Sequence, residues 1–185
     1  MNSYAIPNDA ETIATLRLLS SGVVSIELAK DFPYSKDCHS CCIELADGHW
    51  IQLRATGEDL EFKFEVFPLH ARLVVAPRTG ERHDFVLTAP ATVTPLATES
   101  WLDSAAPTGP TLGSDPIAQF VGQPGSAPAT ASATCRYIGG VELVGANGRT
   151  LAVATGAFPY SLHVSGFYED PSFRRNDYVG LPGKA

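Results

Sequence analysis

The chain has 185 residues, of which 44% are hydrophobic and 18% charged, and its formal net charge is −7. This length and composition allow a buried core, so an entirely disordered protein is excluded. The acidic balance is the wrong sign for a surface that displaces counterions from nucleic acid, so we expect no nucleic-acid partner. Neither a secretory signal nor an apolar run of membrane-spanning length is visible. We therefore expect a cytoplasmic chain without membrane contact, whose four cysteines stay reduced.

The first predicted element is the only helix. Asn8 is a good N-cap and Glu11 follows three residues later, which is the arrangement of a capping box. Apolar residues then recur at helical spacing (Ile13, Leu16, Leu19), and the sequence Ser-Ser-Gly at 20–22 ends the pattern. One face of this helix should lie on the core.

From Val23 onward the apolar period changes to two, which predicts strands. Residues 23–28 predict a strand, and residues 41–54 a hairpin with a type I′ turn at Asp47-Gly48. Residues 60–67 alternate so regularly that they predict one half-buried strand. Residues 71–89 predict a second hairpin, turning near Thr79-Gly80, and Asn147-Gly148 marks a third.

Residues 103–134 are rich in proline, glycine, alanine, serine and threonine, and predict a linker or mobile loop. They separate an N-terminal part, 1–102, from a C-terminal part, 135–185, and we expect the two parts to pack as one domain. The predicted fold class is mainly β: an antiparallel β-sandwich or partly open barrel of about eight or nine short strands, with one N-terminal helix.

Two segments of the chain resemble each other. Residues 43–57 and 141–156 each contain an apolar-Glu-Leu sequence, an Asp-Gly or Asn-Gly turn, an alternating strand and Ala-Thr-Gly. An internal duplication would explain this likeness, and so would the small set of residues that hairpin turns reuse. Both interpretations remain open at this point.

Three of the four cysteines lie within the sequence KDCHSCCIEL, residues 36–45. A structural zinc site usually shows two ligand pairs, and only one is present. Adjacent strand residues point to opposite faces, so Cys41 and Cys42 should not share a metal ion. We therefore expect no metal and no cofactor, with packing as the role of the cysteines. The set that would bind a metal, if one were bound, is Cys38, His39, Cys41 and Cys135.

The sequence carries no nucleophile elbow, phosphate-binding glycine loop or paired histidine ligands, which leaves enzymatic activity open and favours its absence. The favoured function is a non-enzymatic protein-binding or structural module. Its partner-binding residues would be the aromatic and arginine side chains of the C-terminal tail, because these residue types are enriched at interface hot spots (Phe167, Tyr168, Phe173, Arg174, Arg175, Tyr178).

The alternative is a small-molecule-binding β-barrel, acting as a carrier or as an enzyme such as a cyclase or isomerase. Barrel interiors bind apolar ligands with few polar groups, so aromatic side chains would line the pocket. The candidates are Tyr34, Trp50 and Tyr160. The partner, the substrate and the oligomeric state are left open by the sequence.

Overall fold

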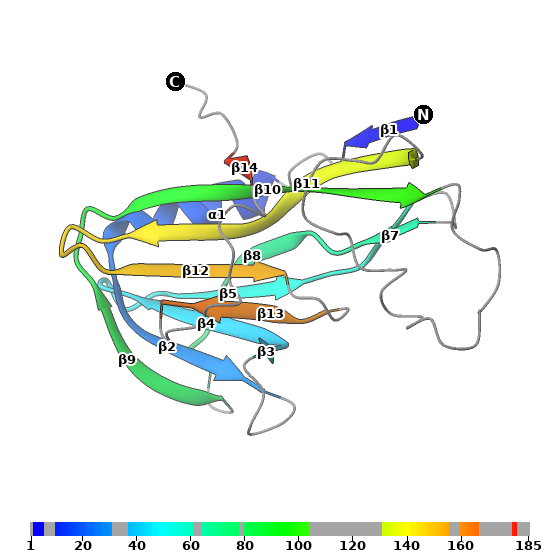
Figure 1. Cartoon of the computed structure of the whole chain (residues 1–185). Helices are drawn as coiled ribbons and strands as arrows, with labels where there is room; N and C mark the ends of the chain where they lie inside the picture. The colour runs from blue at the N-terminus through cyan, green and yellow to red at the C-terminus, as the bar shows by residue number, and fades with distance from the viewer. Residues whose placement is uncertain are drawn as a thin grey trace.

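The computed structural model describes residues 2–5, 10–30, 37–60, 64–77, 80–103, 131–155, 160–166 and 179–180. The fold is mainly β, with 61% strand, two sheets of antiparallel strands and one short N-terminal helix (Figure 1). The predicted fold class is thereby confirmed as a β-sandwich-like arrangement. The described strands do not close into a barrel.

Sheet A has seven strands and contains most of the C-terminal part of the chain. Its order is β14-β10-β11-β12-β13-β3, and β1 pairs with β11 in parallel. The strands are β1 (Asn2–Ala5), β3 (Asp37–Cys38), β10 (Thr92–Asp103), β11 (Ala131–Val144), β12 (Thr150–Thr155), β13 (Leu162–Ser165) and β14 (Val179–Gly180). The long strands β10 and β11 pair directly, so they join the N-terminal and C-terminal parts of the chain in one sheet.

Sheet B has five strands in the order β8-β5-β4-β2-β9. They are β2 (Val23–Ala29), β4 (Ser40–Leu45), β5 (Trp50–Ala55), β8 (Leu69–Val74) and β9 (Glu81–Leu87). Two further short strands, β6 (Glu58–Leu60) and β7 (Phe64–Val66), pair only with each other. The chain changes sheet between β3 and β4, where the amide of His39 donates to the carbonyl of Ala29 at 3.0 Å.

The helix α1 (Ala10–Leu18) lies against strand β8 at one edge of sheet B, and the 3-10 helix η1 (Leu19–Ser21) follows it. The amide of Ala71 in β8 donates to the hydroxyl of Thr12 at 3.1 Å, so the helix satisfies a backbone group at the sheet edge. The predicted apolar face is confirmed, because Leu16 and Leu19 are buried and Ile13 packs on the core. Asn8, the predicted N-cap, lies outside the described residues.

The core fills the space between the sheets, mostly with Leu, Ile and Val side chains from the inward-facing positions of both. Strand alternation accounts for it: in β5, Ile51 and Leu53 are fully buried, whereas Arg54 between Leu53 and Ala55 is exposed. The outer face of sheet B is thereby left to the intervening residues, which are mostly polar.

Two predicted strand pairings are wrong. Residues 71–89 do not form a hairpin, because β8 and β9 lie at opposite edges of sheet B. Residues 60–67 are not one strand, because β6 and β7 pair antiparallel and the chain therefore reverses between Leu60 and Phe64. Alternation identifies extended backbone correctly in both places. It carries no information about which strand becomes the neighbour, since burial of the whole core decides that.

The predicted turn type at Asp47-Gly48 is also wrong. A type I′ turn needs positive φ at both central residues. Gly48 has φ +87°, but Asp47 is not among the described residues with positive φ. The amide of Gly48 instead donates to the carbonyl of Leu45, and the amide of Leu45 donates to the carbonyl of His49, so the loop consists of residues 46–48.

Strands β10 and β11 both extend into the stretch predicted as a linker, because β10 ends at Asp103 and β11 begins at Ala131. The pairing continues to the contact between Asp103 and Ala131. Residues 104–130, which contain most of the prolines and glycines behind that prediction, lie outside the described part of the chain.

Candidate functional site

Polar side chains on strands β5 and β8 form a compact block on the outer face of sheet B. In the strand register Gln52 lies opposite Arg72, and Arg54 lies opposite His70. These four residues occupy the same face, because directly opposed residues in an antiparallel pair point the same way. The two arginines lie on one diagonal of the block, at a spacing that long side chains can bridge.

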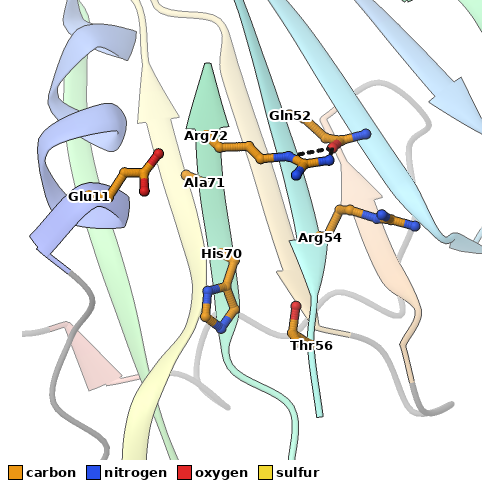
Figure 2. Close-up of a pocket in the computed structure, with 7 residues that line it drawn as sticks. All are labelled: Glu11, Gln52, Arg54, Thr56, His70, Ala71 and Arg72. Carbon is orange, nitrogen blue, oxygen red and sulfur yellow. Dashed lines mark hydrogen bonds between the residues drawn. The ribbon is translucent and has the colours of Figure 1, made fainter. Parts of the chain in front are cut away.

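This block lines a pocket of about 380 Å³, which we call the arginine–histidine pocket. Its lining residues are Glu11, Gln52, Arg54, Thr56, His70, Ala71 and Arg72. Figure 2 shows that Glu11 approaches from helix α1, on the far side of strand β8 from Gln52 and Arg54. The pocket therefore lies where the helix, the edge strand β8 and its neighbour β5 meet.

Arg72 is held in place by Gln52. Both Nε and Nη2 of Arg72 donate to Oε1 of Gln52, at 3.0 and 2.7 Å (Figure 2). The amide nitrogen of Gln52 in turn donates to the hydroxyl of Ser40 at 2.9 Å. Because Gln52 is fixed at both ends, the guanidinium of Arg72 is ordered before any ligand arrives, and its remaining N–H groups stay available.

His70 and Arg54 provide hydrogen-bonding capacity that the described residues do not use. Nε2 of His70 is buried, and the structure gives it no hydrogen-bond partner. Arg54 is exposed and makes no hydrogen bond or ion pair to another described residue. A buried polar atom without a partner is costly, so such an atom at a pocket wall indicates a place where a ligand or water would bind.

The charge of the pocket is opposite to that of the chain. Two arginines face one carboxylate, that of Glu11, in a protein with 20 acidic and 13 basic residues. The guanidinium groups of Arg54 and Arg72 are suited to planar or tetrahedral oxyanions, which they bind through paired N–H donors. The arrangement can hold an anionic group.

A second polar cluster lies on the same face of sheet B. Arg82 on β9 pairs with the carboxylate of Glu44, which also accepts a hydrogen bond from the hydroxyl of Ser25 at 2.6 Å. The Arg82 guanidinium lies 5.3 Å from the ring centre of Trp50. In this cluster the cation and the carboxylate satisfy each other, in contrast to the arginine–histidine pocket, where Arg54 has no described ion-pair partner.

The cysteines are placed as the sequence predicts for Cys41 and Cys42. Cys38 and Cys41 belong to the core, whereas Cys42 lies on the outer face, where its sulfur contacts the Ser40 hydroxyl at 3.8 Å. Burial raises the pKa of the Cys41 thiol well above its usual value, and Cys38 and Cys42 raise it further. Burial also raises the pKa of Cys42, against a smaller lowering by Ser40. Such thiols are poor nucleophiles at neutral pH.

The alternative metal set is divided between two sheets. Cys38 lies in β3 and Cys135 in β11, while Cys41 lies in β4 with His39 between the sheets. Cys38, Cys41 and Cys135 are buried cysteines that form no disulfide. Among the residues that the structure describes, no group of three or more His, Cys, Asp and Glu side chains is placed to hold a metal ion.

The other predicted site residues are not gathered at the pocket. Trp50 is 5% exposed and lies under Arg82, and Tyr160 is 53% exposed, with its ring 5.2 Å from that of Phe67. Neither lines the arginine–histidine pocket. Tyr34 lies outside the described residues, and so do all six partner-binding candidates of the tail, residues 167–178.

Sequence reasoning missed Arg54, His70 and Arg72. One signal was available, because Gln52, Arg54 and Thr56 alternate with the buried Ile51, Leu53 and Ala55 and so had to share one face. The sequence contains no such signal for His70 and Arg72, because its pattern predicts that their strand pairs with β9, whereas β8 pairs with β5. Only the β5–β8 pairing brings His70 beside Arg54.

Comparisons of the chain with protein-family models, with curated proteins and with solved structures gave no match. No helix in the described ranges is long and apolar enough to cross a membrane.

Proposed function

We propose that this protein is a non-enzymatic binding module whose arginine–histidine pocket receives an acidic group of a partner protein. The observation that carries the proposal is the uncompensated cationic capacity of the pocket: Arg54 without a described partner beside the buried, unpartnered Nε2 of His70. A charged group in this position gains hydrogen bonds to ionised donors, which are about twice as strong as neutral ones.

The arrangement favours binding over catalysis. Catalysis by a nucleophile requires its hydrogen bond to a base, and Nε2 of His70 makes no hydrogen bond to the Thr56 hydroxyl at the pocket wall. Recognition of acidic motifs by arginine clusters is a recurrent mode of protein–protein contact. Free thiols at Cys38, Cys41, Cys42 and Cys135 agree with a reducing compartment, and we propose a cytoplasmic location on that basis.

The test uses the whole protein and a fluorescently labelled oligo-glutamate peptide, with binding followed by fluorescence anisotropy. We expect saturable binding that weakens with added salt, because exposed charges are screened. Replacing Arg54 by alanine should raise the Kd roughly tenfold to a hundredfold, the range expected for hydrogen bonds to a charged group.

The matched control is Arg136→Ala. Arg136 is an exposed arginine on β11, in the other sheet, and it has the same charge. The Arg136→Ala variant should bind the peptide with the Kd of the wild type. An equal loss of affinity in the Arg54 and Arg136 variants would show that net charge alone attracts the peptide. Binding of the peptide by the wild type and by Arg54→Ala with the same Kd would remove the pocket from the proposal.

A small carboxylate is the second candidate ligand, in keeping with the small-molecule alternative, because a pocket of about 380 Å³ is large enough for one. Free glutarate competing with the labelled peptide at similar concentration would favour this candidate. Competition only at a large excess would favour the protein partner.

A further inference from the structure

The arginine–histidine pocket offers more donors than one carboxylate needs. Arg54 has its whole guanidinium fork, and Arg72 keeps Nη1 and one N–H of Nη2 after its two bonds to Gln52. Thr56 adds a hydroxyl at the pocket wall, and the His70 imidazole lies beside them with its Nε2 buried. A carboxylate carries one negative charge, so it compensates only one of the two guanidinium charges at the pocket.

We infer that the group received by the pocket is a phosphate monoester dianion; this rests on the proposed function and specifies its ligand. Two guanidinium charges match the charge of the dianion, and its three terminal oxygens offer acceptors to both forks. The strand register places the two arginines on one diagonal of the block, with His70 at a third corner.

Among the described lining residues the carboxylate is that of Glu11. It projects from α1 on the far side of β8 from Arg54 and Gln52 (Figure 2). An anion above the block of Gln52, Arg54, His70 and Arg72 shares the pocket with Glu11, whose side chain approaches from the helix side. Removing this charge with Glu11→Gln should strengthen phosphate binding about twofold or more, because the like charge is nearby and partly screened.

Gln52 is a positioning residue in this site. Its amide oxygen fixes the direction of the Arg72 guanidinium, and its amide nitrogen is fixed by Ser40. Gln52→Leu keeps the size of the side chain and frees Arg72. We expect weaker binding of phosphate with little change in the free energy of unfolding, because both side chains lie on the outer face of the sheet.

The experiment measures binding of three peptides of one sequence by the whole protein, carrying phosphoserine, glutamate or serine at the same position. We expect the phosphoserine peptide to bind at least about tenfold more tightly than the glutamate peptide. Arg54→Lys keeps the charge but loses the fork, so it should weaken phosphoserine binding by about tenfold and glutamate binding by less. Inorganic phosphate and phenyl phosphate, used as competitors, distinguish a free phosphate compound from a phosphorylated protein.

Each outcome decides one of the two proposals. Equal binding of the phosphoserine and glutamate peptides overturns the phosphate assignment and leaves the acidic-group site standing. Absence of binding of both peptides overturns the site itself. If inorganic phosphate competes as well as the phosphoserine peptide, the ligand is a small phosphate compound and the partner is not a protein. Thermal unfolding of each variant verifies that the fold is retained.

Discussion

The hairpins β4–β5 and β11–β12 have the same loop, although they lie in different sheets. In the first, the amide of Gly48 donates to the carbonyl of Leu45 and the amide of Leu45 to the carbonyl of His49. In the second, Gly148 donates to Gly145 and Gly145 to Arg149, so every bond of the first loop has its counterpart. Asp47 and Asn147 each accept the amide of the residue two positions later. The loops therefore define an unambiguous structural alignment.

The inward-facing positions of the two hairpins are equally alike. Aligned on their loops, Ile43 corresponds to Leu143 and Ile51 to Leu151, and all four are fully buried in the common core. The next inward pair follows the same rule (Leu53 and Val153). The period of two and the shared core explain this agreement, because each sheet must present one apolar face to the other.

The outward-facing positions are where the hairpins differ. Arg54 corresponds to Ala154, and Gln52 to Ala152; both alanines are buried, at 0% and 6% exposure. On sheet A this face carries small side chains that lie close to the neighbouring strand, as Gly140 does to Ala154. On sheet B it carries the pocket. The two hairpins therefore share a backbone arrangement and differ in the side chains of the outer face, which line a pocket on sheet B and are small and buried on sheet A.

The alignment also bears on the likeness of the two sequence segments. Glu44 and Glu142 are matched when the two sequence segments are aligned. In the structural alignment based on the loops, Glu44 corresponds to Val144 and Glu142 to Cys42. The two Ala-Thr-Gly sequences are out of register by one residue, because Ala55 corresponds to Thr155. Internal duplication stays a hypothesis, and the identical residues of the two segments do not support it because they are not structurally equivalent.

Exchanging the outer faces should have the largest effect on stability. Ala154→Arg places a guanidinium at a position with 0% exposure, and we expect it to cost about 3–5 kcal/mol in the free energy of unfolding. Arg54→Ala, the reverse exchange on sheet B, should cost less than about 0.5 kcal/mol because Arg54 is exposed. Urea unfolding measures both. Similar losses in the two variants would contradict the distinction between the faces.

The loops should respond alike to the same substitution. Gly48 and Gly148 have φ of +87° and +75°, and a Cβ atom at either position meets no atom within 4 Å. Strain in the left-handed backbone is therefore the whole effect, and Gly48→Ala and Gly148→Ala should each cost about 1 kcal/mol. Unfolding midpoints that differ clearly between the two variants would show that the loops are not equivalent.

The smallest expected effect is on the pH dependence of the free energy of unfolding, and it arises from a core position that differs between the hairpins. Cys41 corresponds to Val141, and burial raises the pKa of its thiol. The folded thiol stays neutral while the unfolded one ionises near pH 8.5, so its contribution to stability is complete below that pH and is lost as the pH rises further. Cys41→Val should reduce this alkaline loss. Urea unfolding at neutral and alkaline pH tests it, and equal slopes for both proteins would contradict it.

Much of the scaffold follows from the sequence. The helix is specified by the spacing of Leu16 and Leu19, and the strands by alternation, because side-chain direction has a fixed period in each element. The positions of two hairpin loops follow from Asp47-Gly48 and Asn147-Gly148, since glycine tolerates positive φ. The opposite faces of Cys41 and Cys42 follow from the same period of two.

The partners of the strands were decided only by the tertiary structure. Nothing local to β8 specifies β5 as its neighbour, because hydrogen bonding between strands is the same for any sequence and the choice depends on how the whole core is buried. The pocket depends on that choice: Arg54 and His70 are 16 positions apart in the chain and directly opposed in the sheet. The sequence determined which residues would face outward, and the pairing of β5 with β8 determined that they would meet.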